Sequence, residues 1–328
     1  MYHNSVGVVG TGYYLPSRIL RNSDLEKLVD TSDEWIRART GIRERRIVSE
    51  HEAASDLAVN AGAEAMKSAA VNPDEIDLVI VATLSPDMLF PSTACIVQHK
   101  LGLKRAFAFD IEAACSGFLF ALSIAEQYIT NGTCKTVLVI GAEVFSRIVD
   151  WQDRNTCVLF GDGAGAVILQ KAETGSGIIS IRLGSDGSGA DLLKLPAGGS
   201  RLKTSHETIK DRQHFIKMNG KEIYKFATTA VVKAIKAALD EQTISSAEID
   251  LLIPHQANIR IIECIAEKLK IPMGKVFVNL DKYGNTSSAS IPIALCEALE
   301  QNRIKKGDII VFVGFGAGLT WGTAIIKW

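Results

Sequence analysis

The two halves of the chain repeat one order of apolar runs, turns and helical patterns. Residues 74–80 (DEIDLVI) are echoed by residues 247–253 (AEIDLLI), and each copy leads through a turn and a helical pattern to an apolar run, at 137–142 and at 309–314. Asp77 precedes Cys115 by 38 positions, and Asp250 precedes Asn285 by 35. An internal repeat of this kind restricts the chain to folds built from equivalent units. We therefore expect two similar βα halves related by a pseudo-two-fold axis.

The local patterns indicate strands that alternate with helices. Residues 76–83 and 137–142 are nearly continuous apolar runs, which are typical of strands buried on both faces. Each half closes on a glycine turn that feeds a last strand, at 165–169 and at 322–326. With 328 residues the chain is longer than one typical domain. We predict an α/β fold whose N-terminal half is 1–173 and whose C-terminal half is 174–328.

Composition excludes several classes of protein. A formal net charge of −1 disfavours a general nucleic-acid binder, which needs a basic excess. The six cysteines show no Cys-x-x-Cys spacing, so neither a zinc site nor a disulfide framework is indicated and a reduced, cytoplasmic protein is expected. Residues 309–326 carry no charge, but four glycines interrupt them. Two buried strands joined by a turn explain this run better than a membrane span.

Cys115 lies where a strand gives way to a helix. The run 106–111 suits a strand, and Phe118, Leu122, Ala125 and Ile129 recur at helical spacing. Unpaired N–H groups and the positive end of the helix dipole favour thiolate at such a position. We therefore expect a nucleophilic thiol of lowered pKa; the alternative is a small buried apolar residue.

Two further polar residues lie at corresponding places in the second half. His255 follows the strand 250–253, at the carboxyl end where open α/β sheets bind ligands. Asn285 lies before a helix predicted over 290–301, where it is either a simple turn residue or a functional one. The repeat places Cys115 and Asn285 in equivalent turns that face a common centre.

Cysteine, histidine and asparagine together admit two chemistries. The order of the three residues and the 140 positions from Cys115 to His255 match papain-like hydrolysis, but a long α/β segment precedes Cys115 here. The other chemistry is acyl transfer with carbon–carbon bond formation. In it a thiolate takes an acyl group from a thioester, and imidazole and carboxamide donors stabilise the enolate that forms when a malonyl unit loses CO2. We favour acyl transfer.

Motifs spread over nearly the whole chain carry a resemblance to a known family. They are GTGYYLP at 10–16, TSDEWI at 31–36, RTGIRER at 39–45, ACSG at 114–117, FGDGAGA at 160–166, HQAN at 255–258, GNTS at 284–287 and FGAGLTWG at 315–322. Together they resemble the thiolase superfamily, and most specifically the β-ketoacyl-acyl-carrier-protein synthase III family. The resemblance implies a thiolase-like fold with α-β-α-β-α layers.

The same resemblance assigns expected roles to individual residues. Cys115 would be the acylated nucleophile, and His255 and Asn285 would bind the malonyl thioester and assist its decarboxylation. The backbone N–H groups of Cys115 and Ala317 would form the oxyanion hole, although the family often has glycine at the second position. The coenzyme A residues would be Trp35 and Arg154, which sandwich the adenine, and Arg39 nearby. Phe90 would reach across a homodimer into the acyl pocket of the partner.

The implied substrates are an acyl-CoA, expected to be acetyl-CoA or another short thioester, and malonyl-acyl-carrier-protein, with no permanently bound cofactor. Between residues 201 and 236 nine Lys or Arg residues face three acids, which suits an acidic carrier protein. We expect docking at Lys221, Lys225 and Arg260. The polar connection 184–213 is expected to shape the pocket entrance. A related ketosynthase or acyltransferase using longer or aromatic acyl-CoA is the alternative, and a Cys-His-Asn hydrolase is a remote one.

Overall fold

The computed structural model describes residues 6–328. They form two principal sheets whose strands pair in the same pattern. The first sheet has the order β1-β7-β6-β4-β5, and the second has the order β8-β13-β12-β11. The first contains β1 (Val6–Tyr14), β4 (Leu78–Ala82), β5 (Phe107–Ile111), β6 (Val137–Glu143) and β7 (Gly163–Lys171). The second contains β8 (Gly177–Ser185), β11 (Leu251–Pro254), β12 (Ile309–Gly316) and β13 (Thr320–Lys327).

The pairing within each sheet confirms the predicted duplication. The β4 strand runs parallel to β6, which is antiparallel to β7, which is antiparallel to β1. The β11 strand runs parallel to β12, which is antiparallel to β13, which is antiparallel to β8. The β5 strand has no full counterpart among the described residues: a single bridge from Leu252 to Val276 takes its place beside β11.

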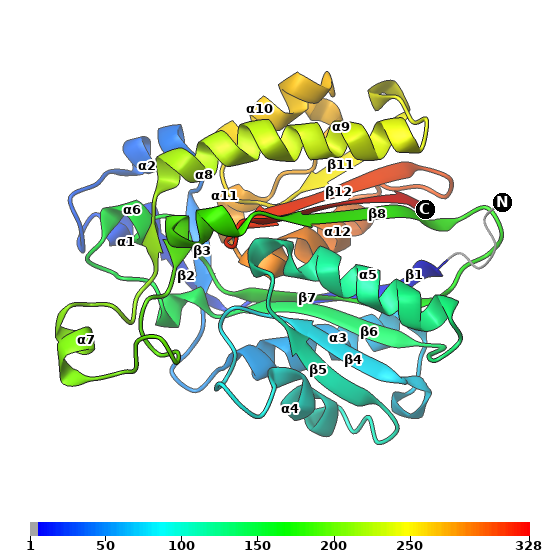
Figure 1. Ribbon diagram of the computed structural model, residues 1–328, viewed down its shortest axis with the longest axis horizontal. Helices are drawn as coiled ribbons and strands as arrows, with labels where there is room; N and C mark the ends of the chain where they lie inside the picture. The colour runs from blue at the N-terminus through cyan, green and yellow to red at the C-terminus, as the bar shows by residue number, and fades with distance from the viewer. Residues whose placement is uncertain (1–5) are drawn as a thin grey trace.

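Helices separate the two sheets and cover their outer faces (Figure 1). Helices α5 (Gly117–Thr130) and α12 (Ser290–Glu300) lie between the sheets and contact both. Helices α3 (Ala54–Ala69) and α4 (Thr93–Lys100) cover the first sheet. On the second sheet lie α8 (Gly220–Phe226), α9 (Val232–Glu241) and α10 (Ile259–Leu269), with a π-helical turn from Ala227–Val231 between α8 and α9. The result is the expected α-β-α-β-α layering.

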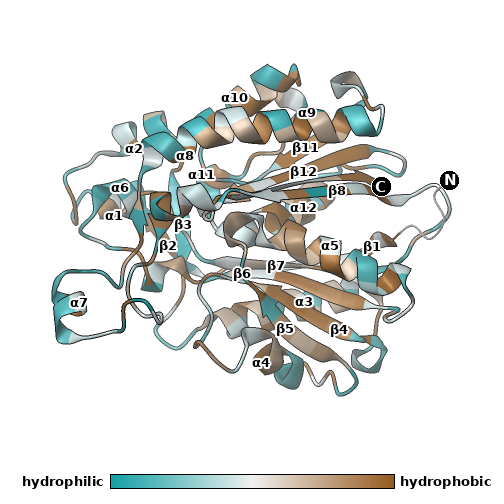
Figure 2. Ribbon diagram, in the orientation of Figure 1, coloured by the Kyte–Doolittle hydropathy of each residue, from teal (hydrophilic) through white to brown (hydrophobic). Residues whose placement is uncertain are grey.

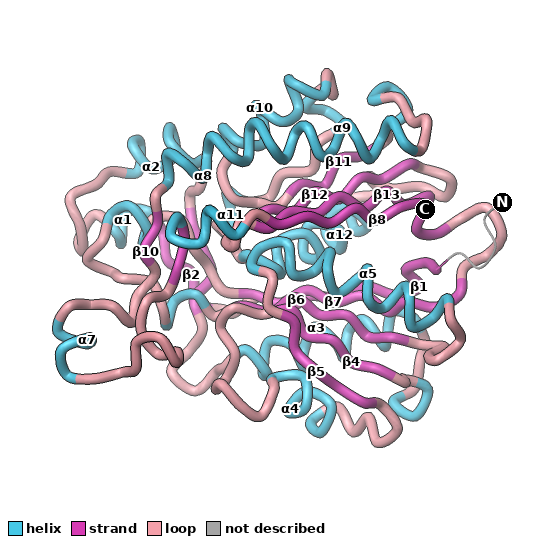
Figure 3. Tube along the Cα trace, viewed as in Figure 1, coloured by secondary structure: helices cyan, strands magenta, loops and turns pink. Residues whose placement is uncertain are grey.

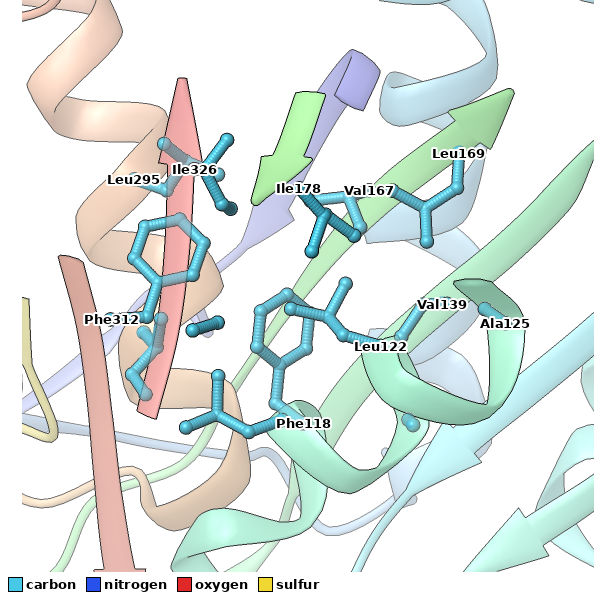
Figure 4. Packing of buried hydrophobic residues seen from close by; sticks show 14 of the residues in the cluster. Phe118, Leu122, Ala125, Val139, Val167, Leu169, Ile178, Leu295, Phe312 and Ile326 are labelled. Atoms are coloured by element: carbon cyan, nitrogen blue, oxygen red, sulfur yellow. The ribbon is translucent and has the colours of Figure 1, made fainter. Parts of the chain in front are cut away.

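The central helices explain why the halves share a core. Helix α5 is apolar over most of its circumference, as a helix enclosed by other elements must be. Figure 4 shows Phe118 and Leu122 of α5 pointing into the space between the sheets. There they pack among side chains of both sheets, namely Val139, Val167, Phe312 and Ile326. Each such side chain contributes about 1.5–3 kcal/mol of burial free energy.

Hydropathy along the strands agrees with this layering. Every residue of β4 and of β6 is buried, as expected for strands covered on both faces. Figure 2 shows these strands in brown, whereas α9 and α10 carry teal residues on their outer turns. Residues 309–326 form β12, a turn and most of β13, as predicted. Among residues 6–328 no helix has the length and apolar character that a membrane crossing requires.

A short segment of the first half packs on the second. It comprises β2 (Arg18–Arg21), α1 (Asn22–Leu25), α2 (Asp33–Thr40) and β3 (Glu44–Ile47). Leu25, Ile36 and Ile42 from this segment share a core cluster with Ile261 and Val313 of the second half. The division at 173/174 falls between β7 and β8, but the packing of this segment ties both halves together.

The connection after β8 is more ordered than its polar composition suggested. It contains a 3-10 turn (Gly187–Leu192), β9 (Leu193–Lys194) and α7 (His206–Lys210), and it ends at β10 (Lys217–Met218), which pairs with β9. The loops around α7 extend away from the body of the molecule (Figures 1 and 3). Two more short helices, α6 (Arg154–Cys157) and α11 (Leu280–Tyr283), lie close to the site described next.

Candidate active site

Cys115 lies in the 3-10 turn Ala114–Ser116, directly before α5. Ala114 has a positive φ of 49°, which turns the chain sharply from β5 into the helix. The end of β12 closes over this turn. A Cβ on Gly316 would lie 2.6 Å from the Cys115 backbone nitrogen, so only glycine permits this approach. As a result the thiol is buried, with 4% of the residue exposed.

The second half has an equivalent turn. The 3-10 turn Ser287–Ala289 precedes α12, and Ser287 has a φ of 48°, like Ala114. Superposing Ala114 on Ser287 aligns Cys115 with Ser288, and Glu112 with Asn285. Cys115 and Asn285 therefore lie at equivalent turns, as predicted, but Asn285 lies three positions before the counterpart of Cys115. The two turns do contact each other, as predicted.

Cys115, His255 and Asn285 line one cavity. The remaining wall comes from β9, from the end of β10, from α8 and from the end of β12, and it includes Leu193, Met218, Ile223 and Phe315. Cys115 lies in the turn before the central helix α5, His255 follows the carboxyl end of β11, and Asn285 lies at the turn before α12. The structure thus brings together the three reactive residues that the sequence singled out.

His255 is a buried neutral imidazole. It lies just after β11 with 1% of its surface exposed, and burial lowers its pKa to about 3. Its Nδ1 lies 2.7 Å from Ser290 Oγ, which also accepts the Gln256 N–H at 3.4 Å. We assign the Ser290 hydroxyl as the donor to Nδ1, which is the tautomer in which Nε2 carries the imidazole proton. His255 therefore presents an N–H donor.

The carboxamide of Asn285 is oriented by its own turn. Its Oδ1 accepts the Ser287 backbone N–H at 2.8 Å, which leaves the NH2 group as the part that can donate to a ligand. The Asn285 backbone donates to the Leu159 carbonyl at 2.8 Å and accepts from Gly161 at 3.0 Å. These bonds anchor the turn to the first half of the chain.

The thiol differs from the sequence-based expectation. Burial raises the pKa of Cys115 to about 12; the nearby Ser287 hydroxyl acts in the opposite direction, and the charge of Glu143 adds to the increase. The prediction of a lowered pKa is therefore wrong. The helix N-terminus is present, but the desolvation of an enclosed sulfur outweighs it. The thiol needs a proton acceptor when it reacts.

A larger cavity of about 410 Å³ opens on the other side of the thiol. Its apolar part includes Phe145 and Phe160, whose stacked rings have centroids 4.7 Å apart. Residues 193–195 of the long connection complete its wall. The predicted contribution of this connection to the pocket is confirmed. Ala317 also lines it, and the positive φ of this turn falls on Gly318, at 126°, so an alanine at 317 adopts its backbone conformation without strain.

The residues expected to hold coenzyme A lie on one side of the molecule. The Arg154 guanidinium lies directly on the Trp35 ring, 4.6 Å from its centroid, and donates to the Asp30 carbonyl at 2.7 Å. An adenine can enter between Trp35 and Arg154 only if the arginine moves. Arg39 is exposed, and its backbone carbonyl accepts from Asn258 at the start of α10.

The remaining predicted residues are exposed. Phe90 is 82% accessible in the segment before α4. Lys221 and Lys225 of α8 and Arg260 of α10 are also exposed, on the outer helical layer of the second half. Among residues 6–328 no group of three or more His, Cys, Asp or Glu side chains is arranged to hold a metal ion.

Sequence reasoning missed the polar residues behind the reactive ones. Glu143 is fully buried at the end of β6, and Ser287 and Ser288 are buried in the turn before α12. Glu112 lines the larger cavity beside the thiol. A carboxylate at the end of an otherwise apolar strand, and serines that follow Asn285, were the available signals.

Comparison with known proteins places this geometry in a family. Sequence models for 3-oxoacyl-[acyl-carrier-protein (ACP)] synthase III and for its C-terminal part match residues 109–187 and 239–328. The β-ketoacyl-[acyl-carrier-protein] synthase III of Caldanaerobacter subterraneus subsp. tengcongensis is 55% identical over 99% of this chain and 98% of its own length. That of Clostridioides difficile is 52% identical over 99% of both.

A solved structure agrees with these sequence matches. The crystal structure of 3-oxoacyl-[acyl-carrier-protein] synthase III from Aquifex aeolicus superposes with a TM-score of 0.92 at 49% identity, covering 98% of this chain and 100% of that one. Fold, paired turns and sequence agree over the full length. The chain therefore belongs to the β-ketoacyl-acyl-carrier-protein synthase III family, the ketosynthase-type acyltransferases of fatty-acid synthesis.

Proposed function

We propose that the protein condenses an acyl-CoA primer with malonyl-acyl-carrier-protein, releasing CO2 and forming the 3-oxoacyl-acyl-carrier-protein that initiates type II fatty-acid synthesis. The observation that carries the proposal is the single cavity lined by a thiol, a neutral imidazole and an oriented carboxamide. A hydrolase needs a histidine that accepts a proton from its cysteine. An imidazole with a pKa of about 3 that presents Nε2–H suits hydrogen-bond donation instead.

In the first half-reaction Cys115 becomes acylated. Its sulfur attacks the thioester carbonyl of acyl-CoA, the oxyanion is stabilised by the backbone N–H groups of Cys115 and Ala317, and coenzyme A leaves as a thiolate. Preorganised backbone donors of this kind contribute about 3–4 kcal/mol to stabilising the transition state. The turn that carries Cys115 and the turn that carries Ala317 are held together by the close approach of Gly316.

In the second half-reaction His255 and Asn285 act together. The Nε2–H of His255 and the NH2 of Asn285 donate to the thioester oxygen of the malonyl group. As the malonyl carboxylate leaves as CO2, negative charge develops on that oxygen, and the two donors stabilise the enolate. The enolate carbon then attacks the acyl-cysteine, and the thiolate of Cys115 leaves. Neither donor has to change its protonation state.

The shape of the larger cavity supports a short primer. The stacked rings of Phe145 and Phe160 line its apolar part. We propose acetyl-CoA or another short acyl-CoA as the natural primer, with Trp35, Arg39 and Arg154 binding the nucleotide end of coenzyme A. Arg154 must leave the Trp35 face to admit the adenine.

The test uses a panel of acyl-CoA thioesters of increasing length. We expect mass spectrometry to find the acyl group on Cys115, most rapidly with short chains, and to find it discharged only after malonyl-acyl-carrier-protein is added. An adduct on another residue, or rapid hydrolysis without malonyl donor, would contradict the proposed function. Preference for a long or aromatic thioester would point to the related ketosynthases instead.

Substitution of the two donors separates the half-reactions. His255→Ala and Asn285→Ala should keep acylation of Cys115 and lower the condensation rate about 100-fold or more, because each removes a donor used only by the enolate. His206→Ala, which removes an exposed imidazole on α7, is the matched control and should condense like the unchanged protein. Loss of acylation in both active-site variants would favour a Cys-His hydrolase.

We place carrier-protein docking on the outer helices of the second half. Lys221 and Lys225 lie on α8, which lines the cavity at Ile223 and Tyr224, and Arg260 lies at the start of α10. Attraction to an acidic carrier depends on salt and on these charges. Lys221→Glu with Arg260→Glu should raise the KM for malonyl-acyl-carrier-protein and leave acylation by acyl-CoA unchanged. An unaltered KM would exclude this surface.

A further inference from the structure

The proposed reaction leaves the proton of the Cys115 thiol without an acceptor. The sulfur is buried, and its pKa is about 12, so it reacts as a thiolate only if a nearby base takes the proton. His255 cannot be that base. Its Nδ1 is occupied by Ser290, and its Nε2 already carries the proton that the enolate needs. A different group must therefore receive the thiol proton.

Glu143 is a buried carboxylate behind the site that the two half-reactions do not use. It is fully enclosed at the end of β6. Its Oε2 accepts the Ser85 hydroxyl at 2.7 Å and the Leu84 N–H at 3.0 Å, and its Oε1 accepts the Ser288 hydroxyl at 2.9 Å. No Lys or Arg within 4 Å neutralises it among the described ion pairs. Burial raises the pKa of this carboxyl to about 7, against these hydrogen bonds.

Ser287 connects the carboxylate with the thiol. Ser287 is fully buried, and the turn that it begins contacts the Cys115 turn. Its hydroxyl makes no hydrogen bond of standard geometry in the resting structure. It nevertheless lies close enough to oppose the increase that burial causes in the pKa of Cys115 and of Glu143. An enclosed hydroxyl without a fixed partner, beside a donor and an acceptor, is free to turn from one to the other.

We propose that Glu143, acting through the Ser287 hydroxyl, accepts the proton of Cys115 during acylation and returns it after condensation. As the sulfur attacks the primer carbonyl, its proton passes to Ser287 Oγ while the Ser287 proton passes to Glu143. The coenzyme A thiolate that leaves takes its proton from solvent. When the enolate displaces Cys115, the thiolate recovers its proton from Glu143 by the reverse route. The enzyme thus ends each cycle in its starting protonation state.

The surroundings of the thiol contain one competing carboxylate. Glu112 lies before the nucleophile turn, lines the larger cavity and accepts the Ala114 N–H at 3.2 Å. Its charge also contributes, after burial, to the raised pKa of Cys115. Unlike Glu143 it is open to solvent and is already bonded to its own turn. The ionisable groups that face the sulfur are therefore Glu143, Glu112 and His255, and only the first has a buried hydroxyl leading to the thiol.

The test measures acylation of Cys115 in a single turnover with acyl-CoA between pH 5.5 and pH 9, followed by mass spectrometry. We expect Glu143→Gln and Ser287→Ala each to slow acylation at pH 7 about 100-fold, as the loss of a general base does. The unchanged protein accepts the proton only when Glu143 is ionised, so its rate should rise through a pH near 7. Both variants should lose this inflection, and the double variant should be no slower than either.

Two further variants separate a proton route from a structural effect. Ser288→Ala removes a hydrogen bond to Glu143 and leaves Ser287 in place, so it should keep the inflection. Glu112→Gln should also keep it. An unchanged pH profile in Ser287→Ala would overturn the proposal even if Glu143→Gln does not fold, and loss of the inflection in Glu112→Gln would assign the base to Glu112. The inference rests on the proposed acyl-cysteine: absence of an adduct in the unchanged protein would refute the function, whereas normal acylation in the variants would refute only the proton route.

Discussion

At the scale of single residues, buried serines beside the reactive groups determine what each of these groups does. Ser290 directs a proton to His255 Nδ1, the Ser287 backbone orients Asn285, and the Ser287 side chain faces Cys115. A buried imidazole beside a carboxylate would be charged or would act as a base. Beside a serine it stays neutral and keeps its Nε2 proton. The chemistry of the site therefore depends on residues that are not themselves reactive.

The first prediction concerns Ser290. In Ser290→Ala, His255 Nδ1 loses its donor, so the tautomer that presents Nε2–H loses the free energy of one hydrogen bond, about 0.5–1.5 kcal/mol. We expect the condensation rate to fall up to about 10-fold while single-turnover acylation of Cys115 is retained. Separate measurement of the two half-reactions checks this. Equal loss in both would show that Ser290 only supports the fold.

Sequence reasoning singled out three residues that the structure places in one cavity, but not their protonation states. Cys115, His255 and Asn285 follow strands or precede helices, and local patterns show such positions. The raised pKa of Cys115 depends on how completely Gly316 and its strand cover the sulfur, which is a property of tertiary packing. That property cannot be read from local pattern. The pairing of Cys115 with Ser288, by contrast, follows from the repeat, because each lies 38 positions after the echoed aspartate, Asp77 or Asp250.

At the scale of elements, the long connection between β8 and β10 joins the primer pocket to the coenzyme A side. Its start supplies residues 193–195 to the cavity, and its end is tied to the first half by Arg212. The Arg212 Nε donates to Asp150 at 2.8 Å, a second bond runs from its NH2 group to the same carboxylate, and the guanidinium also lies 4.9 Å from the centroid of Phe215. Asp150 precedes α6, which carries Arg154.

The second prediction is that this tie holds the connection in a pH-dependent way. The hydrogen bonds from Arg212 are the largest cause of the lowered pKa of Asp150. Because the folded pKa lies below the unfolded value of about 3.9, the stabilisation is present above that pH and is lost as the pH falls toward the folded pKa. Amide exchange in residues 208–216 should become less protected below about pH 4. In Arg212→Gln it should be weakly protected at every pH.

A matched variant makes this measurement specific. Lys210→Gln changes an exposed basic residue at the end of α7, in the same connection. It should keep the exchange pattern of the unchanged protein. Protection that survives in Arg212→Gln would show that the backbone bonds of the connection suffice. One such bond is the Ile216 N–H to the Ile148 carbonyl at 2.9 Å.

The elements themselves were largely predictable. Continuous apolar runs marked β4, β6, β11 and β12, because strands in covered sheets need no polar face. The helix predicted over 290–301 ends within one residue of its observed end at Glu300. The polar connection 184–213 contains β9, which pairs with β10 just beyond it. Two-residue strands form only by pairing with a partner distant in sequence, so the local hydrophobic pattern does not predict them.

At the scale of the whole molecule, the two halves differ at one edge, and that edge exposes apolar surface. The first sheet ends at β5, which pairs only with β4 among the described strands. Phe107 of β5 is 44% exposed and packs beside Phe109 and Tyr128. Leu89 and Phe90 are exposed before α4, the helix that packs on β5. An open, apolar edge strand is a ready surface for pairing with another chain.

We therefore propose that two copies of the chain pair through β5, which would bring Phe90 of each copy toward the larger cavity of the other. The third prediction follows: Phe107→Glu should shift the protein from dimer to monomer in sedimentation velocity, because a charge at a paired edge opposes association. Met273→Glu, which changes a residue with 41% exposure in the second half, is the control and should leave the dimer intact. A dimer that persists in Phe107→Glu would place the contact elsewhere.

If the pairing is correct, Phe90→Ala should keep the dimer and increase the acylation rate with longer primers, because the cavity would lose the wall that the partner supplies.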